Sequence, residues 1–396
     1  MTITQPAVDV SALPVVDLDT SALADDPYST YRHLRETAPV VWAPAINKIL
    51  FTTFEACAYV ENHPEIFSSH VEGAAMVKAL GGRPLIRKDD PDHATERQSM
   101  NRPLRPRNIQ GAWNALFEQN AETYLDRLVE AGPGADLNTE FAMPLAGKNL
   151  IDMLGLHGVD PLDIARWSLD FIAGSGNVTD DPDIWLRCET SRAECDAALD
   201  EAIPRLRAHP DASITSAMLA GGLPEDAVRN NVKLTISGGI NEPQHMITNI
   251  VYELSRHPET LEAARQDPTT WDSIFNEAVR KYTPIGMITR ETVAKGEFEG
   301  FHIPAGAQVG ALLASANRDE GRFPDPDGFS LHRSETTSLA FGRGVHQCAG
   351  KWAAQSSIGR IAIPRLYERL PDLHQDRPET WNGWVFRGMT SLPVTW

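Results

Sequence analysis

The sequence predicts a mainly helical protein that carries one small β-rich region. Apolar residues recur at helical spacing through most of residues 93–203 and again over residues 224–282. Between Thr289 and Ala314 the spacing changes to strand-like alternation, with a turn at Pro304-Ala-Gly306. No internal repeat or low-complexity linker divides the 396 residues, so we expect a single domain over residues 1–396.

The first quarter of the chain contains short elements of both kinds. Residues 1–24 are punctuated by proline and are expected to form an irregular arm, and the Asp-Asp-Pro run at 25–27 begins a predicted helix. Two apolar runs, 40–42 and 49–52, indicate a β-hairpin, and a helix is expected over Phe54–Asn62.

Glycine and proline punctuate the rest of the chain. Residues 73–92 are rich in both and are interpreted as a long loop of the kind that covers binding sites. The following helical region is interrupted at 132–134, 156–158 and 174–176. The later sequence predicts a long helix from Pro224 to His257 and shorter helices over 258–265 and 271–282. An irregular stretch is expected over 317–333, followed by a helix running toward Leu370 and by short C-terminal strands.

Composition narrows the class of protein. A net charge of −18 argues against nucleic acid or an anionic membrane as the main partner. The four cysteines form no CxxC pair and no regular framework, which favours a reducing compartment. The N-terminus lacks a basic region followed by an apolar run, and no apolar stretch reaches membrane-spanning length. We therefore expect a cytoplasmic protein.

The segment Phe341-Gly-Arg-Gly-Val-His-Gln-Cys348-Ala-Gly350 surrounds one cysteine with three glycines. Gly342 and Gly344 permit positive φ angles that bring backbone N–H groups toward the sulfur. A helix is expected directly after the loop, and its N-terminus would stabilise a thiolate by roughly 0.3–1 kcal/mol. The arrangement suits an anionic sulfur bound to a metal, although a cysteine in such a loop can also be an inert buried thiol.

This segment resembles the haem-thiolate signature of the cytochrome P450 family, Phe-x-x-Gly-x-His-x-Cys-x-Gly, at every position. The resemblance covers nearly the whole chain from Asp26-Pro27-Tyr28 onward. It implies the cytochrome P450 fold, haem b as cofactor, Cys348 as the axial iron ligand, and Phe341 and Gly350 as haem contacts. A cysteine ligand favours O–O cleavage, the chemistry of oxygen insertion.

Two further sets of residues take their roles from the same resemblance. Glu277 and Arg280 are three apart on a predicted helix, where they could be a surface pair; the family's Glu-x-x-Arg motif implies that they form a buried structural cluster with Arg333. Haem propionates need cations or hydrogen-bond donors. The positions that match propionate-binding residues of the family are His93, Arg97, Arg290 and His346.

A proline-containing interruption, Ile236-Ser-Gly-Gly-Ile-Asn-Glu-Pro-Gln244, lies within the long helix that begins at Pro224. Pro243 removes a helical hydrogen bond and displaces the carbonyl of Gly239, so the helix should open there. The interruption could be a plain break between two helices. With a haem beside it, the opening becomes an oxygen site.

The residues at this opening depart from the family pattern. Most cytochromes P450 carry an acid followed by a threonine that guide protons to oxygen, whereas this chain has Asn241 and Glu242. The amide-acid-proline order and the C-terminal segment Trp381–Trp396 resemble the guaiacol O-demethylase group of the family. By this resemblance, Asn241 and Glu242 are the catalytic candidates.

The same group resemblance suggests a small apolar pocket suited to a flat aromatic. Its substrate contacts would be Leu234, Gly238, Ile285 and Phe386. The small run Gly174-Ser-Gly176 matches a bulky aromatic of the demethylases, which predicts room for a second methoxy group. Aromatic residues in C-terminal strands can also be ordinary core.

The favoured function is oxidative O-demethylation of a small methoxy-substituted aromatic such as guaiacol or syringol, which releases a phenol and formaldehyde. A hydrogen-peroxide-driven peroxygenase at the same haem is the alternative, and a non-catalytic haem sensor or carrier is a third possibility of another class. For the dioxygen reaction we expect a ferredoxin or a flavin/iron-sulfur reductase as partner. The cations expected at its docking site are Arg102, Arg105, Arg107, Arg343 and Lys351, although such a run can also be a solvated basic face.

Overall fold

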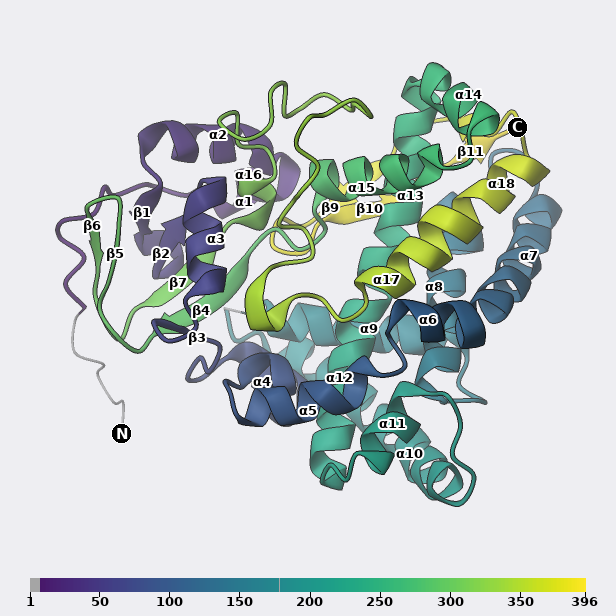
Figure 1. The fold of residues 1–396 in the computed structure, drawn as a ribbon, viewed down its shortest axis with the longest axis horizontal. Coiled ribbons are helices and arrows are strands. Elements are labelled where there is room, and N and C mark those ends of the chain that lie inside the picture. The colour runs from purple at the N-terminus through teal and green to yellow at the C-terminus, as the bar shows by residue number, and fades with distance from the viewer. Residues whose placement is uncertain (1–7, 178) are drawn as a thin grey trace.

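The computed structural model describes residues 8–177 and 179–396, and helices dominate it (Figure 1). A β-rich part lies at one side of the molecule and a larger helical part at the other. The α-helices are α1 (Thr20–Asp25), α2 (Pro27–Thr37), α3 (Phe54–Asn62), α4 (Ala75–Leu80), α5 (Asp92–Asn101), α6 (Pro106–Asn108), α7 (Asn114–Ala131), α8 (Met143–Leu154), α9 (Pro161–Ser175), α10 (Pro182–Ala208), α11 (Ile214–Ala220), α12 (Glu225–Gly239), α13 (Asn241–Arg256), α14 (Pro258–Gln266), α15 (Thr270–Tyr282), α16 (Leu313–Ala316), α17 (Lys351–Ala354) and α18 (Ile363–Arg369).

Shorter and wider helical turns connect several of these helices. The 3₁₀ turns are Pro44–Ile46, Leu85–Arg87 and Gly344–His346, and the π-helical segments are Ile109–Trp113, Asn138–Ala142 and Gln355–Ala362. The last π segment joins α17 to α18, so residues 351–369 form one continuous helical rod behind the cysteine loop.

The β-rich part is built on one mixed sheet with strand order β1-β2-β7-β4-β3. The hairpin of β1 and β2 is antiparallel, and β2 then pairs in parallel with β7, with Ile49 opposite Val309. The strands are β1 (Val40–Ala43), β2 (Lys48–Phe51), β3 (Phe67–Ser68), β4 (Ile288–Thr292), β5 (Gly296–Phe298), β6 (Phe301–Ile303), β7 (Gln308–Ala311), β8 (His374–Gln375), β9 (Thr380–Asn382), β10 (Gly388–Ser391) and β11 (Val394–Thr395).

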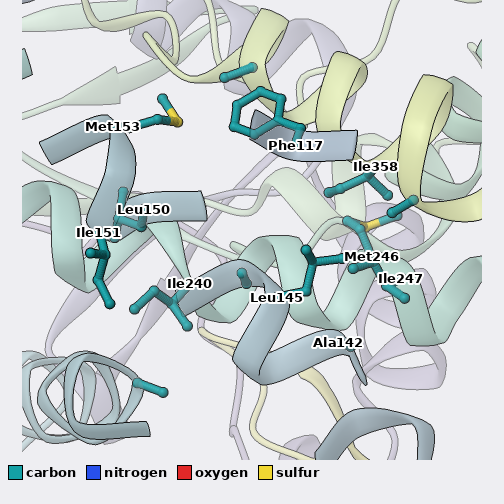
Figure 2. Packing of buried hydrophobic residues seen from close by; sticks show 14 of the residues in the cluster. Phe117, Ala142, Leu145, Leu150, Ile151, Met153, Ile240, Met246, Ile247 and Ile358 are labelled. Atoms are coloured by element: carbon teal, nitrogen blue, oxygen red, sulfur yellow. The ribbon is translucent and has the colours of Figure 1, made fainter. Parts of the chain in front are cut away.

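The helical part encloses the largest hydrophobic cluster, which α13 crosses (Figure 2). Met246 and Ile247 of α13 share this cluster with Leu145 and Leu150 of α8, and all four side chains are buried. Burial of a side chain of this size contributes roughly 1.5–3 kcal/mol. The packing fixes α13 and the end of α12 beside the cysteine loop, and it thereby positions the candidate site.

Most predicted elements are confirmed, including the β1–β2 hairpin, helix α3 and the three helical interruptions. The arm expected to be irregular instead contains α1. Asp19 caps α1 by accepting from the N–H groups of Ser21 and Ala22, and Leu23 is buried in the core. Such a short helix depends on that tertiary contact, which the local sequence does not show.

One further prediction needed correction. The predicted loop 73–92 contains α4 and a 3₁₀ turn, because Ala79 and Leu80 are buried. The long helical region from Pro224 to His257 is interrupted where Pro243 predicted an opening: α12 ends at Gly239 and α13 begins at Asn241. Across the described ranges, no helix is long and apolar enough to cross a membrane.

Candidate active site

The cysteine loop is a compact turn closed by its own backbone. The N–H of Cys348 donates to the carbonyl of Phe341 at 2.8 Å. Gly342 and Gly344 have φ angles of 64° and 65°, as expected from their spacing. A Cβ on either glycine would also collide with Glu61 of α3, at 2.7 and 2.5 Å respectively. Glycine is therefore required for both the backbone conformation and the close approach of α3.

The Cys348 thiol faces an internal space. The side chain of Cys348 lies deep in the molecule, yet it borders open space rather than packed atoms. A Cβ on Gly350 would lie 3.8 Å from its Sγ. Burial raises the pKa of the thiol, while backbone N–H groups of Gly350 and Lys351 and the charge of Arg97 act in the opposite direction. The N–H groups at the start of α17 thus lower the pKa of the thiol, as predicted, but by less than burial raises it.

Cations and histidines from α5, β4 and the loop itself converge at this place. The rings of His93 and His346 lie 4.1 Å apart between centroids. Arg97 donates to the carbonyl of Gln347, next to Cys348. Arg290, from β4, is 6% exposed. The four propionate-binding candidates are therefore brought to the same region, and the ring of Phe341 stacks on that of Phe275 behind the loop.

The region carries more positive charge than the chain neutralises. Arg97, Arg290 and Arg87 form no ion pair with any described residue. Burial, followed by the charges of Arg290, His93, Arg97 and Arg87, lowers the pKa of His346 to about 3. Burial lowers the pKa of Arg87 to about 10. A buried group bearing two carboxylates would neutralise this cluster.

Unpartnered polar atoms at the same place support that fit. His93 Nε2, His346 Nδ1 and Arg87 Nε are buried and have no hydrogen-bond partner among the described residues. With the internal thiol, these donors suit a haem held by Cys348 with its propionates on the cation cluster. Arg87 is absent from the sequence prediction. Its only signal was its place six residues before His93, in a segment interpreted as a binding loop.

The predicted charge cluster is present and buried. Arg280 Nε and Nη2 donate to the two carboxylate oxygens of Glu277, both at 2.8 Å, and Arg333 Nε donates to Glu277 Oε1 at 2.8 Å. Arg280 also donates to the carbonyls of Asn317 and Pro326. The cluster ties α15 to the irregular segment that precedes the cysteine loop.

The break between α12 and α13 produces an opening beside the thiol. Ile240 has φ −121° and ψ −55°, and Pro243 lies in the first turn of α13. Gly238 is exposed to the interior, and a Cβ there would meet only Glu242 Oε1, at 3.9 Å. Glu242 Oε2 is buried without a partner, and burial raises the pKa of this carboxyl to about 7. Its charge also raises the pKa of Cys348, so the two groups are neighbours.

Asn241 occupies a different environment from Glu242. Its Nδ2 donates to Ser168 Oγ of α9 at 2.6 Å, and its Oδ1 accepts from Gln244 at 3.4 Å. Ser168 Oγ in turn donates to the carbonyl of Ser237 at 3.2 Å. The amide of Asn241 is therefore committed to holding α9 against the break, whereas the carboxyl of Glu242 is free.

The candidate substrate contacts fall into two pairs. Leu234 and Gly238 are one turn apart on α12, and Ile285 forms an isolated antiparallel bridge with Phe386. The room predicted at Gly174 is not there. A Cβ on Gly174 would lie 2.4 Å from Cys188 Sγ and 2.8 Å from Ala79 Cβ, so this glycine serves the close packing of α9 on α10 and α4.

Three of the predicted docking cations, Arg102, Arg105 and Arg107, are exposed, whereas Arg343 and Lys351 are partly buried. Arg102 and Arg107 line two adjoining grooves of about 870 and 580 Å³, and Arg105 lines the smaller one. None of these three arginines forms an ion pair within residues 8–177 and 179–396. The surface at these grooves is therefore positive. Trp352, one residue after Lys351, is 46% exposed.

Comparisons with known proteins identify the family. A sequence model of the family described as Cytochrome P450 matches residues 194–362. The chain is 30% identical over 323 residues to Cytochrome P450 107B1 of Saccharopolyspora erythraea, covering 79% of this chain and 77% of that protein. It is 28% identical over 407 residues to Cytochrome P450 monooxygenase PikC of Streptomyces venezuelae, covering 97% and 94% of the two chains.

Solved structures show the same fold. P450BioI, in complex with an acyl carrier protein ligated to hexadec-9Z-enoic acid, superimposes with a TM-score of 0.87 over 96% of this chain and 100% of that chain, at 24% identity. CYP109E1 from Bacillus megaterium, in complex with testosterone, gives 0.84 over 95% and 99%, at 22% identity. The site geometry, the 30% identical relative and this shared fold lead to one conclusion: the chain belongs to the cytochrome P450 family, monooxygenases that bind haem b through a cysteine thiolate.

Proposed function

We propose that residues 1–396 form a single haem-thiolate oxygenase domain that O-demethylates small methoxy-substituted aromatics of the guaiacol or syringol type. In this proposal Cys348 would bind the haem iron, and the haem would supply oxygen activation and insertion into a C–H bond. His93, Arg97, Arg290 and His346 would hold the propionates, with Arg87 as an added partner.

The observation that carries the proposal is the bridge between Ile285 and Phe386. It holds a flat aromatic side chain beside an aliphatic one, and both are only partly buried. Gly238, which has no side chain, lies next to the free Glu242 carboxyl. Flat apolar walls and a small oxygen-side opening suit a planar ring better than a large flexible substrate. The resemblance of Trp381–Trp396 to the guaiacol O-demethylases supports the same substrate class.

The chemistry on the substrate balances when dioxygen, two electrons and two protons are supplied. One oxygen atom enters a C–H bond of the methoxy carbon and gives a hemiacetal. The hemiacetal then collapses, the bond between that carbon and the aryl oxygen breaks, and the proton of the hemiacetal hydroxyl is transferred to the phenolate. The products are a phenol and formaldehyde, while the second oxygen atom of dioxygen leaves as water with two electrons and two protons.

The electrons come in this proposal from an acidic ferredoxin or a flavin/iron-sulfur reductase. The surface formed by Arg102, Arg105, Arg343 and Lys351 is complementary in charge to such a partner. Charge complementarity of this kind mainly raises the rate of association. The exposed Trp352 would lie within the contact, where aromatic side chains often contribute most of the binding free energy.

A second candidate function, peroxide-driven oxygenation, is favoured by the unpartnered Glu242 carboxyl. With a pKa of about 7, this group can accept a proton from hydrogen peroxide at one oxygen atom and return it to the other. Threonine, which usually stands at this position in the family, is a poor base near neutral pH. The same haem site would then need no protein partner.

Spectral titration of the ferric protein with methoxyphenols and methoxybenzoates tests the substrate class. A ligand that displaces water from the iron shifts the Soret band, so we expect guaiacol or syringol to shift it and the matching dihydroxybenzenes to shift it far less. Formaldehyde is then measured with a reducing system, with peroxide alone and with neither. No formaldehyde under any condition would overturn O-demethylation, and ligand binding without turnover would indicate a haem sensor or carrier.

A further inference from the structure

Arg387 is a buried cation whose side-chain hydrogen bonds to described residues all go to backbone carbonyls. It is 7% exposed, and its Nη1 donates to the carbonyls of Ala24 and Gly383, both at 2.7 Å. Its Nη2 donates to the carbonyl of Asp25 at 2.8 Å. Within the part of the chain that the structure describes, no carboxylate lies at ion-pair distance from it. Burying an arginine in this way is costly unless its hydrogen bonds have a function.

Two of those carbonyls belong to the end of α1. The last carbonyls of a helix have no partner within the helix, and arginine side chains can satisfy them. Ala24 and Asp25 are the final residues of α1, and Leu23 anchors the helix in a core cluster that includes Tyr31 and Leu34. Helix α1 therefore presents fixed acceptors to Arg387.

Gly383, the source of the third carbonyl, lies in the turn that carries Phe386. Gly383 has a φ angle of 80°, and a Cβ there would lie 2.0 Å from the Phe386 carbonyl oxygen. On its inner side, the turn is tied to the segment after α15. The N–H of Arg387 donates to the Pro284 carbonyl at 2.9 Å, and the N–H of Gly286 donates to the Val385 carbonyl at 2.7 Å.

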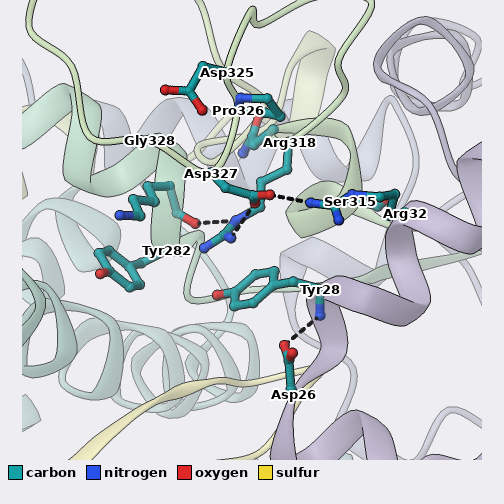
Figure 3. A network of polar contacts seen from close by, with 12 residues as sticks. Asp26, Tyr28, Arg32, Tyr282, Ser315, Arg318, Asp325, Pro326, Asp327 and Gly328 are labelled. Carbon is teal, nitrogen blue, oxygen red and sulfur yellow. Dashed lines mark hydrogen bonds and ion pairs between the residues drawn. The ribbon is translucent and has the colours of Figure 1, made fainter.

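A cavity of about 410 Å³ borders Trp381 and Arg387, which flank this turn on either side. Its lining also includes Asp25, Asp26 and Tyr28. One wall is firmly held: the guanidinium of Arg318 lies 3.4 Å from the centroid of the Tyr28 ring and is paired with Asp327, as Figure 3 shows. The turn therefore has space to move outward, and the Arg387 hydrogen bonds oppose that movement.

We infer that Arg387 is a positioning residue that favours ligands carrying an aromatic ring over small ligands, because it fastens the turn bearing Phe386 to the end of α1. The inference rests on the proposed place of Phe386 against the substrate ring. It gives the N-terminal helix α1 a role in substrate selection, although α1 itself does not line the site. Loss of the fastening frees Phe386 to retreat toward the cavity, so ligands with a ring in the pocket lose a contact and small ligands do not.

The test compares two iron ligands, imidazole and 4-phenylimidazole, whose binding is followed by the shift of the Soret band. For Arg387→Met we expect about tenfold weaker binding of 4-phenylimidazole, which corresponds to about 1.4 kcal/mol, and an unchanged affinity for imidazole. Arg387→Lys keeps the charge but offers fewer donors, so its affinity for 4-phenylimidazole should lie between those of the native protein and Arg387→Met. Equal losses for both ligands, or none, would overturn the inference.

Leu23→Ala tests the same fastening by loosening α1, which supplies two of the carbonyls that Arg387 binds. It provides the test if Arg387→Met does not fold. Leu13→Ala is its matched control, because Leu13 is also buried in the N-terminal arm but belongs to a different core cluster. Of these two variants, only Leu23→Ala should lower the affinity for 4-phenylimidazole relative to the affinity for imidazole. In the Leu23/Arg387 double variant the two effects should not add, because both act on one contact.

Hydrogen exchange provides a readout that needs no ligand. The amides of Gly286 and Arg387 should exchange faster in Arg387→Met and in Leu23→Ala, but not in Leu13→Ala. If the affinity ratio changes while no methoxyarene is demethylated, the fastening stands and the proposed substrate class fails. If demethylation is observed but neither the ratio nor the exchange changes, the proposed function stands and Arg387 is only a structural residue.

Discussion

The rings of His93 and His346 lie 4.1 Å apart between centroids, and each ring keeps one buried nitrogen without a hydrogen-bond partner. The arginines around this pair, Arg87, Arg97 and Arg290, form no ion pair with any described residue, and burying them is costly unless an anionic group lies against them. The pair is therefore arranged for a ligand that carries carboxylates.

Arg87 should contribute to holding that ligand. We expect Arg87→Met to lose haem at least about tenfold faster, because a charge-assisted hydrogen bond is worth roughly 1.5–3 kcal/mol. The measurement is the rate of haem transfer to an excess of apomyoglobin. Arg83→Met, in the same segment, is the control, since Arg83 donates only to the Arg87 carbonyl. Equal rates for the two variants would remove Arg87 from the propionate site.

Cys348→Ser tests the axial ligand. The variant should lack the red-shifted Soret band of the ferrous carbon monoxide complex, because that band requires a thiolate opposite the carbon monoxide. It should also retain less haem after gel filtration. Cys195→Ser, at a thiol buried in the helical core, should keep the band. A normal band in Cys348→Ser would mean that another group is the ligand.

Glu242→Gln tests the proton carrier. Glutamine keeps the size of the side chain but cannot take a proton, so the peroxide-driven rate should fall by about 10²–10⁴-fold. Substrate affinity, from the Soret titration, should change little. Asn241→Ala should affect the peroxide rate less, because its amide is engaged with Ser168. A peroxide rate equal to that of the native protein would exclude Glu242 as the carrier.

Glu242 should also make stability depend on pH. Burial raises its pKa from 4.5 in the unfolded chain to about 7, so the folded protein holds a proton that the unfolded chain releases in this range. The stabilisation by the neutral carboxyl is fully present below pH 4.5 and is lost as the pH rises through 7. The change amounts to on the order of 3 kcal/mol.

Urea unfolding of the native protein and of Glu242→Gln from pH 4.5 to 8 measures this effect. The variant should gain stability relative to the native protein as the pH rises, by up to that amount. Glu118→Gln, at an exposed position on α7, is the control and should show a constant difference. A constant difference for Glu242→Gln as well would mean that water or a cation stabilises the carboxylate.

Reversing the charge of Arg102 and Arg105 together should slow reduction by an acidic partner. It should also flatten the dependence of the rate on salt, because exposed charges are screened within about 8 Å at physiological ionic strength. Stopped-flow reduction under carbon monoxide gives the rate, and the Soret titration should show unchanged substrate binding. Unaltered reduction kinetics would leave these arginines as a solvated basic face.

The sequence predicted the features that depend on local pattern. The tight cysteine loop and the opening at Gly238–Pro243 were found from residue type and spacing, whereas the burial of the Glu277–Arg280 pair was implied only by the family resemblance. The loop and the opening each carry their signal within ten residues, and glycine or proline makes that signal strong.

What the sequence missed depends on contacts between distant segments. Arg87 enters the cation cluster only because the 3₁₀ turn places it near Arg290 of β4. Gly174 appeared to leave space, but Cys188 and Ala79, from other helices, fill it. The side chain of Asn241 turned out to face α9 rather than the opening. No local pattern contains this information, because the partner lies elsewhere in the chain.

The parallel pairing of β2 with β7 has a consequence for biosynthesis. Ile49 and its partner Val309 are separated by most of the polypeptide, so a ribosome making about 5–20 residues per second would deliver them tens of seconds apart. Until β7 emerges, the apolar hairpin of β1 and β2 has an unpaired edge that invites aggregation. His93 and Arg97 are likewise translated long before Arg290 and Cys348. The nascent chain would thus acquire its cofactor only after Arg290 and Cys348 have emerged, and a chaperone that shields the early hairpin should raise the yield of haem-loaded protein.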